Sequence, residues 1–266
     1  MKLAFMTFIA PQWSLTEHLT AAVRYGYEGL EPRAEAGQQH GVELTTTKKE
    51  RAEIAARFRD SGVELCCLAT SRTYALEPAA QAESVELTRR LVELVRDCGG
   101  DKLRVFGGIP PPGMTLEDSR RRIAEGLVAC VEAAAAAQVY LCLETHDSLC
   151  HAGHVREILE AVNSPWVAAN WDLMHPVFSG GQTMPEAFDD LRPWIRHCHV
   201  HDGVQDEGGL AFRPLGEGVL DHRQAVRLLA AAGYAGYLSG EWIGVEREAY
   251  LPHDVRVLRE YLADVG

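Results

Sequence analysis

Three features that mark common classes of protein are absent from this sequence: an excess of basic residues, a C-x-x-C pair, and a glycine-rich turn after the first apolar segment. The 26 basic and 38 acidic side chains give a formal net charge of −12. Because nucleic-acid-binding surfaces are basic, this charge argues against a nucleic-acid partner. The seven cysteines are odd in number and mostly lie in apolar runs, which indicates buried, reduced thiols in a cytoplasmic protein. Cys150 and Cys198 lie near polar clusters, so a ligand role stays open for either.

Long hydrophobic runs are absent as well. The most apolar stretch, 127–143, is interrupted by Glu132 and Gln138, so no segment is able to span a bilayer. The apolar segment 3–10 is followed by Pro11 instead of a small-residue cleavage site, and we interpret it as a strand. With 47% hydrophobic and 24% charged residues, the composition is that of a globular protein without membrane spans.

The sequence does contain a regular alternation of short β-rich runs and segments with helical spacing. We predict strands at 3–9, 29–32, 63–70, 102–107, 139–146, 167–172, 195–202 and 237–242. Helical patterns follow them at 16–25, 48–61, 82–98, 116–137, 154–162, 184–191, 223–232 and 252–263. Parallel strands need crossover helices, and eight units in 266 residues leave roughly 33 residues for each, which is typical of a closed barrel.

An open, doubly wound sheet is the competing architecture. It would carry a glycine-rich phosphate turn after its first strand, whereas residues 10–14 contain no glycine. A weak internal repeat supports equivalent units, because Gly26-Tyr-Glu-Gly29 precedes the second strand and Gly233-Tyr-Ala-Gly236 precedes the eighth. We therefore predict an α/β fold, a single (β/α)8 TIM barrel that spans residues 1–266 as one domain.

Polar side chains end four consecutive predicted strands. Glu144 lies near the end of strand five, Asp172 ends strand six and Glu241 lies near the end of strand eight, and strand seven carries alternating histidines. In a barrel the carboxyl ends of the strands form one rim, where active sites lie. A single acid at a strand end is more often a helix cap or a solvated loop residue. Four such residues at equivalent positions predict a metal site instead.

Strand seven offers three histidines on one face, at positions 197, 199 and 201. The middle one, His199, lies at the depth that best matches the three carboxylates. Three carboxylates and one imidazole form a hard, oxygen-rich ligand set, which suits one divalent cation, Mn²⁺ first and Mg²⁺, Co²⁺ or Fe²⁺ as alternatives. Such a cation would neutralise acids that otherwise repel one another inside the barrel.

In its motifs the sequence resembles the xylose-isomerase-like barrel family, the sugar phosphate isomerase/epimerase group, over nearly the whole chain. The D-x-x-H step and the H-x-H strand are fairly specific in combination. The resemblance is carried by Gly26-Tyr-Glu-Gly-Leu-Glu31, Leu143-Glu-Thr-His146, Trp171-Asp-Leu-Met-His175, His197-Cys-His199, Pro214-Leu-Gly-Glu-Gly218, Gly233-Tyr-Ala-Gly236 and Ser239-Gly-Glu-Trp242.

The resemblance implies roles for particular residues. It implies that Glu144, Asp172, His199 and Glu241 bind the metal, and that His175 contacts hydroxyls or the carbonyl of the substrate. As in the keto-sugar epimerases, Glu144 and Glu241 would also move protons on opposite faces of the substrate. The implied activity is a metal-dependent isomerisation or epimerisation of a keto-sugar or related polyhydroxy ketone, by proton abstraction and a metal-stabilised enediolate.

Several positions depart from the keto-sugar epimerases. Those enzymes have an arginine at the position of Gln205, and Arg213 of the same loop is the candidate to replace it as a substrate-binding residue. Many relatives have a lysine at the position of His201, which we also assign to substrate binding. Where the epimerases have Pro and Asn after the strand-five glutamate, this chain has Thr145 and His146.

These departures move the chain toward another branch. Residues 103–107, the Glu-Thr-His step and residues 191–197 are similar to metal-dependent 3-dehydroshikimate dehydratases and to barrel subunits that eliminate an aglycone from 3-keto-glycosides. In that branch a histidine at the position of His146 would be the catalytic base, although the dehydratases have a lysine in place of His201. The alternative function is therefore a metal-dependent lyase or dehydratase. Both branches begin with enolisation of a metal-bound ketone.

Other residues near the predicted rim have two interpretations each. Arg104 either holds a substrate carboxylate or hydroxyl inside the barrel, or forms a salt bridge with a nearby acid. Trp242, like Trp13, either lines the sugar site or packs in the core. Glu31 and Arg33 either form an ion pair at the rim or contact the substrate.

Two further functions are weighed against these. A DNA-repair endonuclease with a multi-zinc centre would need more ligands and a basic surface, which the net charge of −12 argues against. A barrel that only binds a sugar would not need four ligands and a nearby histidine. We expect a small carbohydrate-like substrate, unphosphorylated because no glycine-rich cradle is evident, and no nucleic-acid or membrane partner. A homo-oligomer or a partner subunit stays open.

Overall fold

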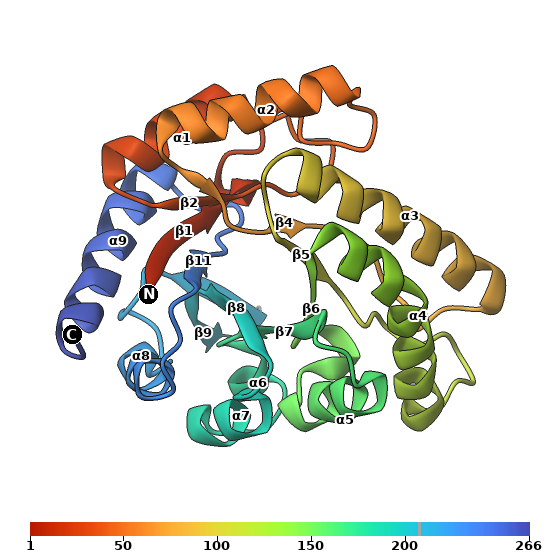
Figure 1. Cartoon of the computed structure of the whole chain (residues 1–266). Helices are drawn as coiled ribbons and strands as arrows, with labels where there is room; N and C mark the ends of the chain where they lie inside the picture. The colour runs from red at the N-terminus through yellow and green to blue at the C-terminus, as the bar shows by residue number, and fades with distance from the viewer. Residues whose placement is uncertain (207–208) are drawn as a thin grey trace.

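Nine parallel strands form one sheet that curves into a barrel, with the helices around it (Figure 1). The computed structural model describes residues 1–206 and 209–266. The strands are β1 (Lys2–Met6), β2 (Gly29–Glu31), β3 (Glu64–Leu65), β4 (Leu68–Ala69), β5 (Lys102–Val105), β6 (Tyr140–Glu144), β7 (Val167–Asp172), β8 (Ile195–Val200) and β11 (Tyr237–Gly240). They occupy the eight predicted segments, and the predicted barrel fold is confirmed. The third segment is divided into β3 and β4 because Cys66 and Cys67 leave the ladder between them.

The first and last strands of the chain lie side by side. β1 pairs with β11, with Lys2 opposite Tyr237 and Phe5 opposite Gly240 (Figure 1). The full strand order is β3-β2-β1-β11-β8-β7-β6-β5-β4. The strands at its two ends, β3 and β4, are the halves of the divided segment. A parallel bridge pairs Arg33, just beyond β2, with Ala69 in β4. The barrel is therefore nearly closed, and the carboxyl ends of its strands form one rim.

The helices of the outer ring confirm the predicted helical segments, with shifts at several ends. They are α1 (Leu15–Tyr25), α2 (Lys48–Ser61), α3 (Pro78–Asp97), α4 (Leu116–Ala137), α5 (Ala152–Val162), α7 (Met184–Leu191), α8 (His222–Ala231) and α9 (Arg247–Ala263). The expected start of the last helix is wrong by five residues. Proline is common in the first turn of a helix, but Pro252 lies inside α9.

Local signals in the sequence determine several of these ends. Ser14 and Glu17 form a capping box at the start of α1, and Thr47 and Glu50 form another at the start of α2. Gly26 ends α1 in the left-handed region, at φ 83°, which a residue with a side chain rarely adopts. The Gly-Tyr-Glu-Gly motif thus places a helix stop directly before β2.

Two elements at the rim are absent from the expectations. A short helix, α6 (His175–Phe178), follows β7, and an antiparallel hairpin of β9 (Asp202–Asp206) and β10 (Gly209–Arg213) follows β8. The expected strand 195–202 therefore ends at Val200, and its last residue starts the hairpin. The stretch after it contains several glycines and no clear alternation, so its sequence is typical of a loop.

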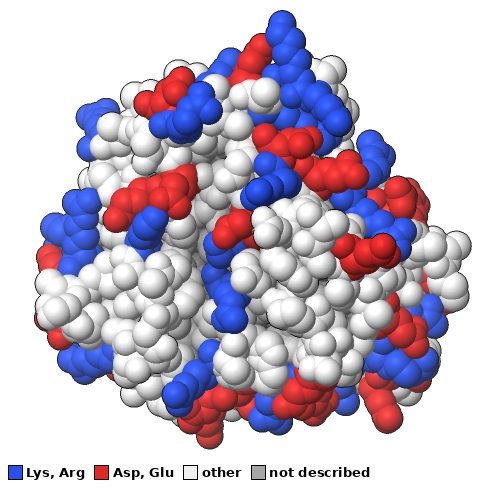
Figure 2. Space-filling model, in the orientation of Figure 1, with Lys and Arg blue, Asp and Glu red and all other residues white. Residues whose placement is uncertain are grey.

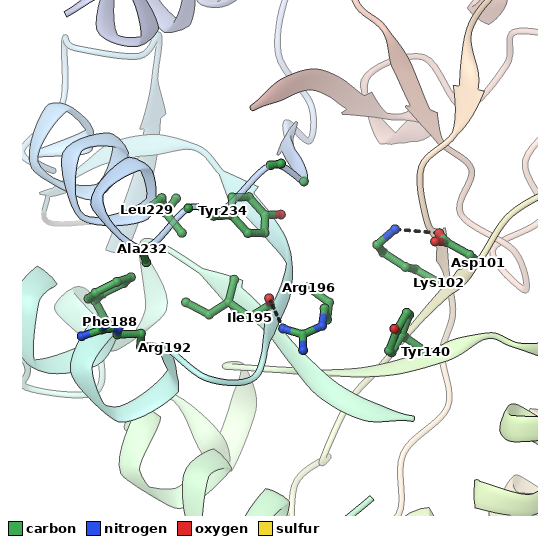
Figure 3. Close-up of a pocket in the computed structure, with 13 residues that line it drawn as sticks. Asp101, Lys102, Tyr140, Phe188, Arg192, Ile195, Arg196, Leu229, Ala232 and Tyr234 are labelled. Atoms are coloured by element: carbon green, nitrogen blue, oxygen red, sulfur yellow. Dashed lines mark hydrogen bonds and ion pairs between the residues drawn. The ribbon is translucent and has the colours of Figure 1, made fainter. Parts of the chain in front are cut away.

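The amino-terminal ends of the strands enclose a hollow of ≈ 380 Å³ (Figure 3). The first residues of β5, β6 and β8 line it, and Lys102 forms an ion pair there with Asp101. Arg196 lies across the hollow from that pair and donates a hydrogen bond to the carbonyl oxygen of Ile195 (Figure 3). The predicted ligands lie at the opposite ends of the strands, so this hollow is not part of the candidate site.

The outer surface carries charges of both signs. On the face shown in Figure 2, acidic and basic side chains are interspersed, so the net negative charge does not gather there in one patch. No helix within residues 1–206 and 209–266 is both long and apolar enough to cross a membrane. All seven cysteines are free, and six of them are buried.

Candidate active site

Four polar side chains from four neighbouring strands converge at the rim of the barrel. Glu144 ends β6, Asp172 ends β7, His199 lies near the end of β8, and Glu241 directly follows β11. One ligand atom from each lies within 4.8 Å of the other three, and all four residues are buried. Nδ1 of His199 lies 2.7 Å from Oε1 of Glu144 and 3.1 Å from Oε2 of Glu241. The structure thus brings together the four residues that the sequence predicts as ligands.

The register of the sheet sets this convergence. A shift between Ala169 and Asn170 in β7 changes the pairing with β8, so that Asp172 lies opposite His199. On the other side, Ser239 of β11 lies opposite His199, and the backbone N–H of Glu241 donates to the carbonyl oxygen of Val200. Both neighbouring strands therefore deliver their carboxylates to the level of one imidazole.

The D-x-x-H step has a structural explanation in Asp172. Oδ1 of Asp172 accepts hydrogen bonds from the backbone N–H groups of Met174, at 2.8 Å, and His175, at 3.0 Å. This turn starts α6 and turns His175 back over the rim. Oδ2 stays available, and it lies 2.8 Å from Nε2 of His201. In this motif Oδ1 of Asp172 holds the backbone turn, and Oδ2 of the same carboxylate faces the site.

His197 and His199 of β8, and His201 directly after it, contact three different levels of the barrel. Deepest is His197, whose Nε2 lies 2.7 Å from Oε2 of Glu31. His199 contacts the carboxylate cluster, and His201 contacts Asp172 at the exit. The intervening Cys198 packs in the hydrophobic core behind the sheet. The predicted alternation of this strand is confirmed, and the proposed metal ligand is the middle histidine.

Glu31 does not occupy the expected place. The expectation of an ion pair between Glu31 and Arg33 at the rim is wrong, because Glu31 is fully buried and turned into the barrel under His199. Arg33 instead donates to the carbonyl oxygen of Ala34 and to Oγ of Ser71. The two side chains diverge because Pro32 lies between them, and the chain leaves β2 there. The charges of His199 and His197 overcome burial and lower the pKa of Glu31 well below its usual range.

Arg104 is fully buried in the wall of the barrel, and its Nε lies 3.2 Å from Oε2 of Glu144. Its Nη1 donates a hydrogen bond to the carbonyl oxygen of Thr70, and its guanidinium lies 3.9 Å from the ring centre of Phe106. Of the two interpretations of Arg104, the salt bridge to a nearby acid is the one present in the structure. A contact of Arg104 with substrate stays a prediction.

Imidazole rings form the wall beside the cluster. The ring of His146 lies 4.4 Å from that of His175, and the ring of His175 lies 5.7 Å from that of His201. Nδ1 of His146 forms an ion pair with Oδ1 of Asp147 at 2.9 Å. Burial lowers the pKa of His146, but the Asp147 contact and the charge of Glu144 outweigh burial and raise this pKa to about 9. A charged imidazole therefore faces the site.

The remaining predicted residues lie farther out or deeper in the fold. Arg213 is exposed at the end of β10 and donates to the carbonyl oxygen of Phe212. Trp242 is fully buried, and its ring packs against that of Tyr250 with a centre-to-centre distance of 6.4 Å. The substrate-binding roles of both residues stay predictions.

One rim residue without an assigned role in the sequence organises the loop after β10. The buried Asp202 accepts backbone N–H groups from Gly216 and Gly218, both at 3.0 Å, and from Leu220 at 3.3 Å. A Cβ at Gly218 would lie 2.0 Å from Oδ1 of Asp202, so the Pro-Leu-Gly-Glu-Gly turn needs glycine there. The signal in the sequence was the His201-Asp202 step, which places this acid at the exit of β8.

The electrostatics of the cluster fit a divalent cation. Oε2 of Glu144 and Oδ2 of Asp172 are buried, and neither accepts a well-directed hydrogen bond from the residues that the structure describes. Burial would raise the pKa of Glu241, but the charge of His199 lowers it to about 2, so this carboxylate is ionised. Ionised, buried carboxylates are stable only with cationic partners. Three such carboxylates and one imidazole are a donor set for a hard divalent ion.

Comparisons with known proteins place this fold and site in context. A family model described as xylose isomerase-like TIM barrel matches residues 19–261. The L-ribulose-5-phosphate 3-epimerase UlaE of Escherichia coli is 25% identical over 235 residues, which cover 85% of this chain and 81% of the relative.

Solved structures extend the comparison. The probable 3-DHS dehydratase AsbF, involved in petrobactin synthesis in Bacillus anthracis, matches with a TM-score of 0.81 at 20% identity over 97% of this chain and 99% of that one. An L-ribulose 3-epimerase matches with a TM-score of 0.81 at 19% identity over 99% and 95% of the two chains. The IOLI protein with a binding zinc atom matches with a TM-score of 0.83 at 15% identity over 100% and 99%. At these identities the likeness shows the shared fold alone.

Proposed function

Because the chain belongs to the xylose isomerase-like TIM barrel family, we propose that it is a metal-dependent isomerase or epimerase of a keto-sugar or a related polyhydroxy ketone. The observation that carries this proposal is the buried convergence of Glu144, Asp172, His199 and Glu241 on one point. Glu144 and Glu241 come from strands on opposite sides of β8, and both carboxylates reach Nδ1 of His199. A ketone held there would have a carboxylate on each side.

The four residues would hold one divalent cation, with Mn²⁺ as the first candidate and Mg²⁺, Co²⁺ or Fe²⁺ as alternatives. When bound, such a cation polarises a carbonyl and stabilises the negative charge that develops on its oxygen. The IOLI protein, which has the same fold, binds a zinc atom by its description, and this supports the proposal that the present barrel holds a metal.

Proton transfer falls to the two glutamates. The ionised carboxylate of Glu241 reaches the cluster with Oε2 3.1 Å from Nδ1 of His199, so we assign it the removal of the proton next to the carbonyl. Glu144 would return a proton from the other side, which gives epimerisation when the proton reaches the same carbon and isomerisation when it reaches the neighbouring one. The imidazoles of His175 and His201 would donate to substrate hydroxyls or to the carbonyl.

A β-elimination is the second candidate function, and a specific observation favours it. Oε2 of Glu144 lies 3.2 Å from Nε of Arg104, which holds this carboxylate in the wall, while His146 and Asp147 form a separate acid–base pair at the rim. One carboxylate base and one imidazole suffice for removal of a proton and departure of a hydroxyl or an aglycone. The similarity to the probable 3-DHS dehydratase supports this alternative.

The substrate we propose is a small carbohydrate-like molecule. The epimerase relatives act on ribulose or its 5-phosphate, by their names, and no glycine-rich cradle in this sequence points to a phosphate. The seven free thiols fit a reducing, cytoplasmic compartment. A homo-oligomer or a partner subunit is compatible with the proposal.

The test is metal analysis of the purified protein, followed by NMR in D₂O with a panel of keto-sugars, 3-dehydroshikimate and 3-keto-glycosides. The proposal predicts bound divalent metal and deuterium at the carbon next to the carbonyl without loss of a group. Loss of water or of an aglycone would instead establish the elimination. No turnover of any panel member by the metal-loaded protein, with intact folding, would contradict both candidates. Glu43→Gln, at the rim outside the cluster, is the control variant and should keep the activity of the wild type.

A further inference from the structure

A fully buried carboxylate lies beneath the candidate metal centre and bonds to two histidines at once. Oε2 of Glu31 is 2.7 Å from Nε2 of His197, and Oε1 of Glu31 is 3.0 Å from Nε2 of His199. All three side chains are fully buried. Glu31 comes from β2, on the far side of β1 and β11 from β8, so it reaches the histidines across the interior of the barrel.

This contact determines which nitrogen of His199 is free. Both ring nitrogens of His199 face carboxylates: Nε2 faces Glu31, and Nδ1 faces Glu144 and Glu241, 2.7 and 3.1 Å away, where the four ligand atoms converge. A cation in the cluster would take the place of a proton on Nδ1, and Glu31, whose carboxylate accepts hydrogen bonds, would keep the remaining proton on Nε2. The other tautomer would direct an N–H group into the cation site and repel a cation.

The same carboxylate is also held in place. His197 bonds to one oxygen and His199 to the other, so the plane of the Glu31 carboxylate cannot rotate without the loss of a hydrogen bond. Neighbouring rungs on one face of β8 supply both imidazoles, which explains why the deeper histidine of the H-x-H motif is present although it does not reach the cluster.

We propose that Glu31, supported by His197, is a positioning residue that fixes the tautomer and the ring orientation of His199 and thereby raises the affinity of the cluster for a divalent cation. This inference rests on the proposed function, because it assumes that the cluster binds a cation. A purely structural role does not account for Glu31 well, since apolar residues of similar volume usually stabilise a protein as well as a buried ion pair does. Loss of such an outer partner of a metal-binding histidine weakens metal affinity about 10- to 100-fold.

The experiment measures Mn²⁺ binding by EPR titration of the purified wild type and of Glu31→Gln, without any substrate. We expect the affinity of Glu31→Gln for Mn²⁺ to fall about 10- to 100-fold, measured at a temperature where a melting profile in EDTA shows the variant to be folded. Glu28→Gln is the matched control, because Glu28 precedes β2 and its carboxylate accepts the backbone N–H of Leu3, at 2.9 Å. It should bind Mn²⁺ as the wild type does. Glu31→Asp, which keeps the charge on a shorter stem, should recover part of the affinity.

A second readout needs no variant. Long-range ¹H–¹⁵N correlation spectra of the Zn²⁺-loaded wild type, assigned with His199→Asn, should show His199 with its proton on Nε2. A proton on Nδ1 would overturn the inference, as would equal Mn²⁺ affinities of Glu31→Gln and the wild type. A wild type that binds no divalent cation would overturn the proposed function and this role together.

One alternative has its own signature in the same titration. Cys67 lies close enough to Glu31 and His197 for the three to hold an ion themselves. A second equivalent of Co²⁺ with a thiolate-to-metal absorption band, lost in Cys67→Ser, would make Glu31 a ligand and contradict its positioning role. We expect one equivalent and no such band.

Discussion

Nε of Arg104 lies 3.2 Å from Oε2 of Glu144, and both side chains are fully buried. This ion pair gives the two glutamates of the site different partners. Arg104 and His199 both contact Glu144, whereas Glu241 contacts His199, at 3.1 Å. The guanidinium therefore holds the Glu144 carboxylate in the wall of the barrel, and the two glutamates reach His199 from strands on opposite sides of β8.

Replacement of Arg104 by methionine should destabilise the metal-free protein strongly. Removal of one partner leaves the buried charge of Glu144 uncompensated, which costs about 3–5 kcal/mol of unfolding free energy. Saturation with Mn²⁺ should reduce this loss, because a bound cation also neutralises Glu144. Urea denaturation in EDTA and in Mn²⁺ measures both quantities.

Lys102→Met is the matched control for that measurement. Lys102 lies on the same face of β5, but its ammonium pairs with the half-exposed Asp101, and such pairs contribute about 1 kcal/mol or less. Equal losses in Arg104→Met and Lys102→Met would show that the Arg104–Glu144 pair does not stabilise the site.

His146→Gln should separate the two candidate functions. If the protein is an isomerase or epimerase, His146 is not the base, and we expect the rate of solvent-deuterium incorporation to fall less than about tenfold. Glu241→Gln should lower the same rate about 10²-fold or more, which is the usual contribution of a general base. The reverse order of these two effects would support the elimination, in which His146 takes a direct part.

Asp202→Ala should loosen the rim. Asp202 is buried and accepts backbone N–H groups from three residues of the 216–220 segment, and the loss of these three hydrogen bonds should cost about 3 kcal/mol. Asp221→Ala removes an aspartate that caps α8 through the single N–H of Gln224 and should cost about 1 kcal/mol. Chemical denaturation of both variants tests this difference, and similar losses would argue against the role of Asp202.

His18→Leu should make the stability of the protein less sensitive to acid. Burial and the charge of His40 lower the pKa of His18 to about 3 in the folded state, whereas a histidine in the unfolded chain has a pKa near 6.5. Above pH 6.5 the residue is neutral in both states. Between pH 6.5 and 3 only the unfolded state takes up the proton, so the free energy of unfolding decreases as the pH is lowered.

The size of this effect is measurable at pH 5. We compare the free energy of unfolding of His18→Leu with that of the wild type at each pH. The variant minus wild-type difference should be about 2 kcal/mol more favourable to the variant at pH 5 than at pH 8. Urea denaturation at both pH values gives the comparison, and the pH 8 pair is the internal control. A difference between the two proteins that is the same at pH 8 and pH 5 would mean that His18 takes up its proton in the folded state as well.

The convergence of the site could be predicted from sequence because it depends on two periodic rules. Side chains alternate along β8, which places His199 on the inner face, and parallel strands end on one side, which brings Glu144 and Asp172 to the same rim. Neither rule requires knowledge of the distance between two residues in the folded chain. The capped ends of α1 and α2 are predictable for the same reason, since a capping box is a local pattern.

Partners across the barrel could not be predicted in this way. Alternation does not show that Glu31 reaches β8, because the two segments are more than 160 residues apart and their side chains meet only after the barrel closes. The two interpretations of Arg104 could not be separated for the same reason. The hairpin of β9 and β10 has no strong alternation, and contacts such as the stacking of Phe212 on His201 accompany it instead.

The most direct test of the account is solvent-deuterium incorporation next to the carbonyl of a turned-over substrate, followed by NMR for three states of one preparation: metal-loaded, chelated, and reloaded with Mn²⁺. We predict exchange in the loaded protein, its loss after chelation, its return with Mn²⁺, and its absence in loaded Glu241→Gln. Exchange that persists in chelated wild type or in Glu241→Gln without bound metal would contradict the proposal that these four residues hold a cation for proton abstraction.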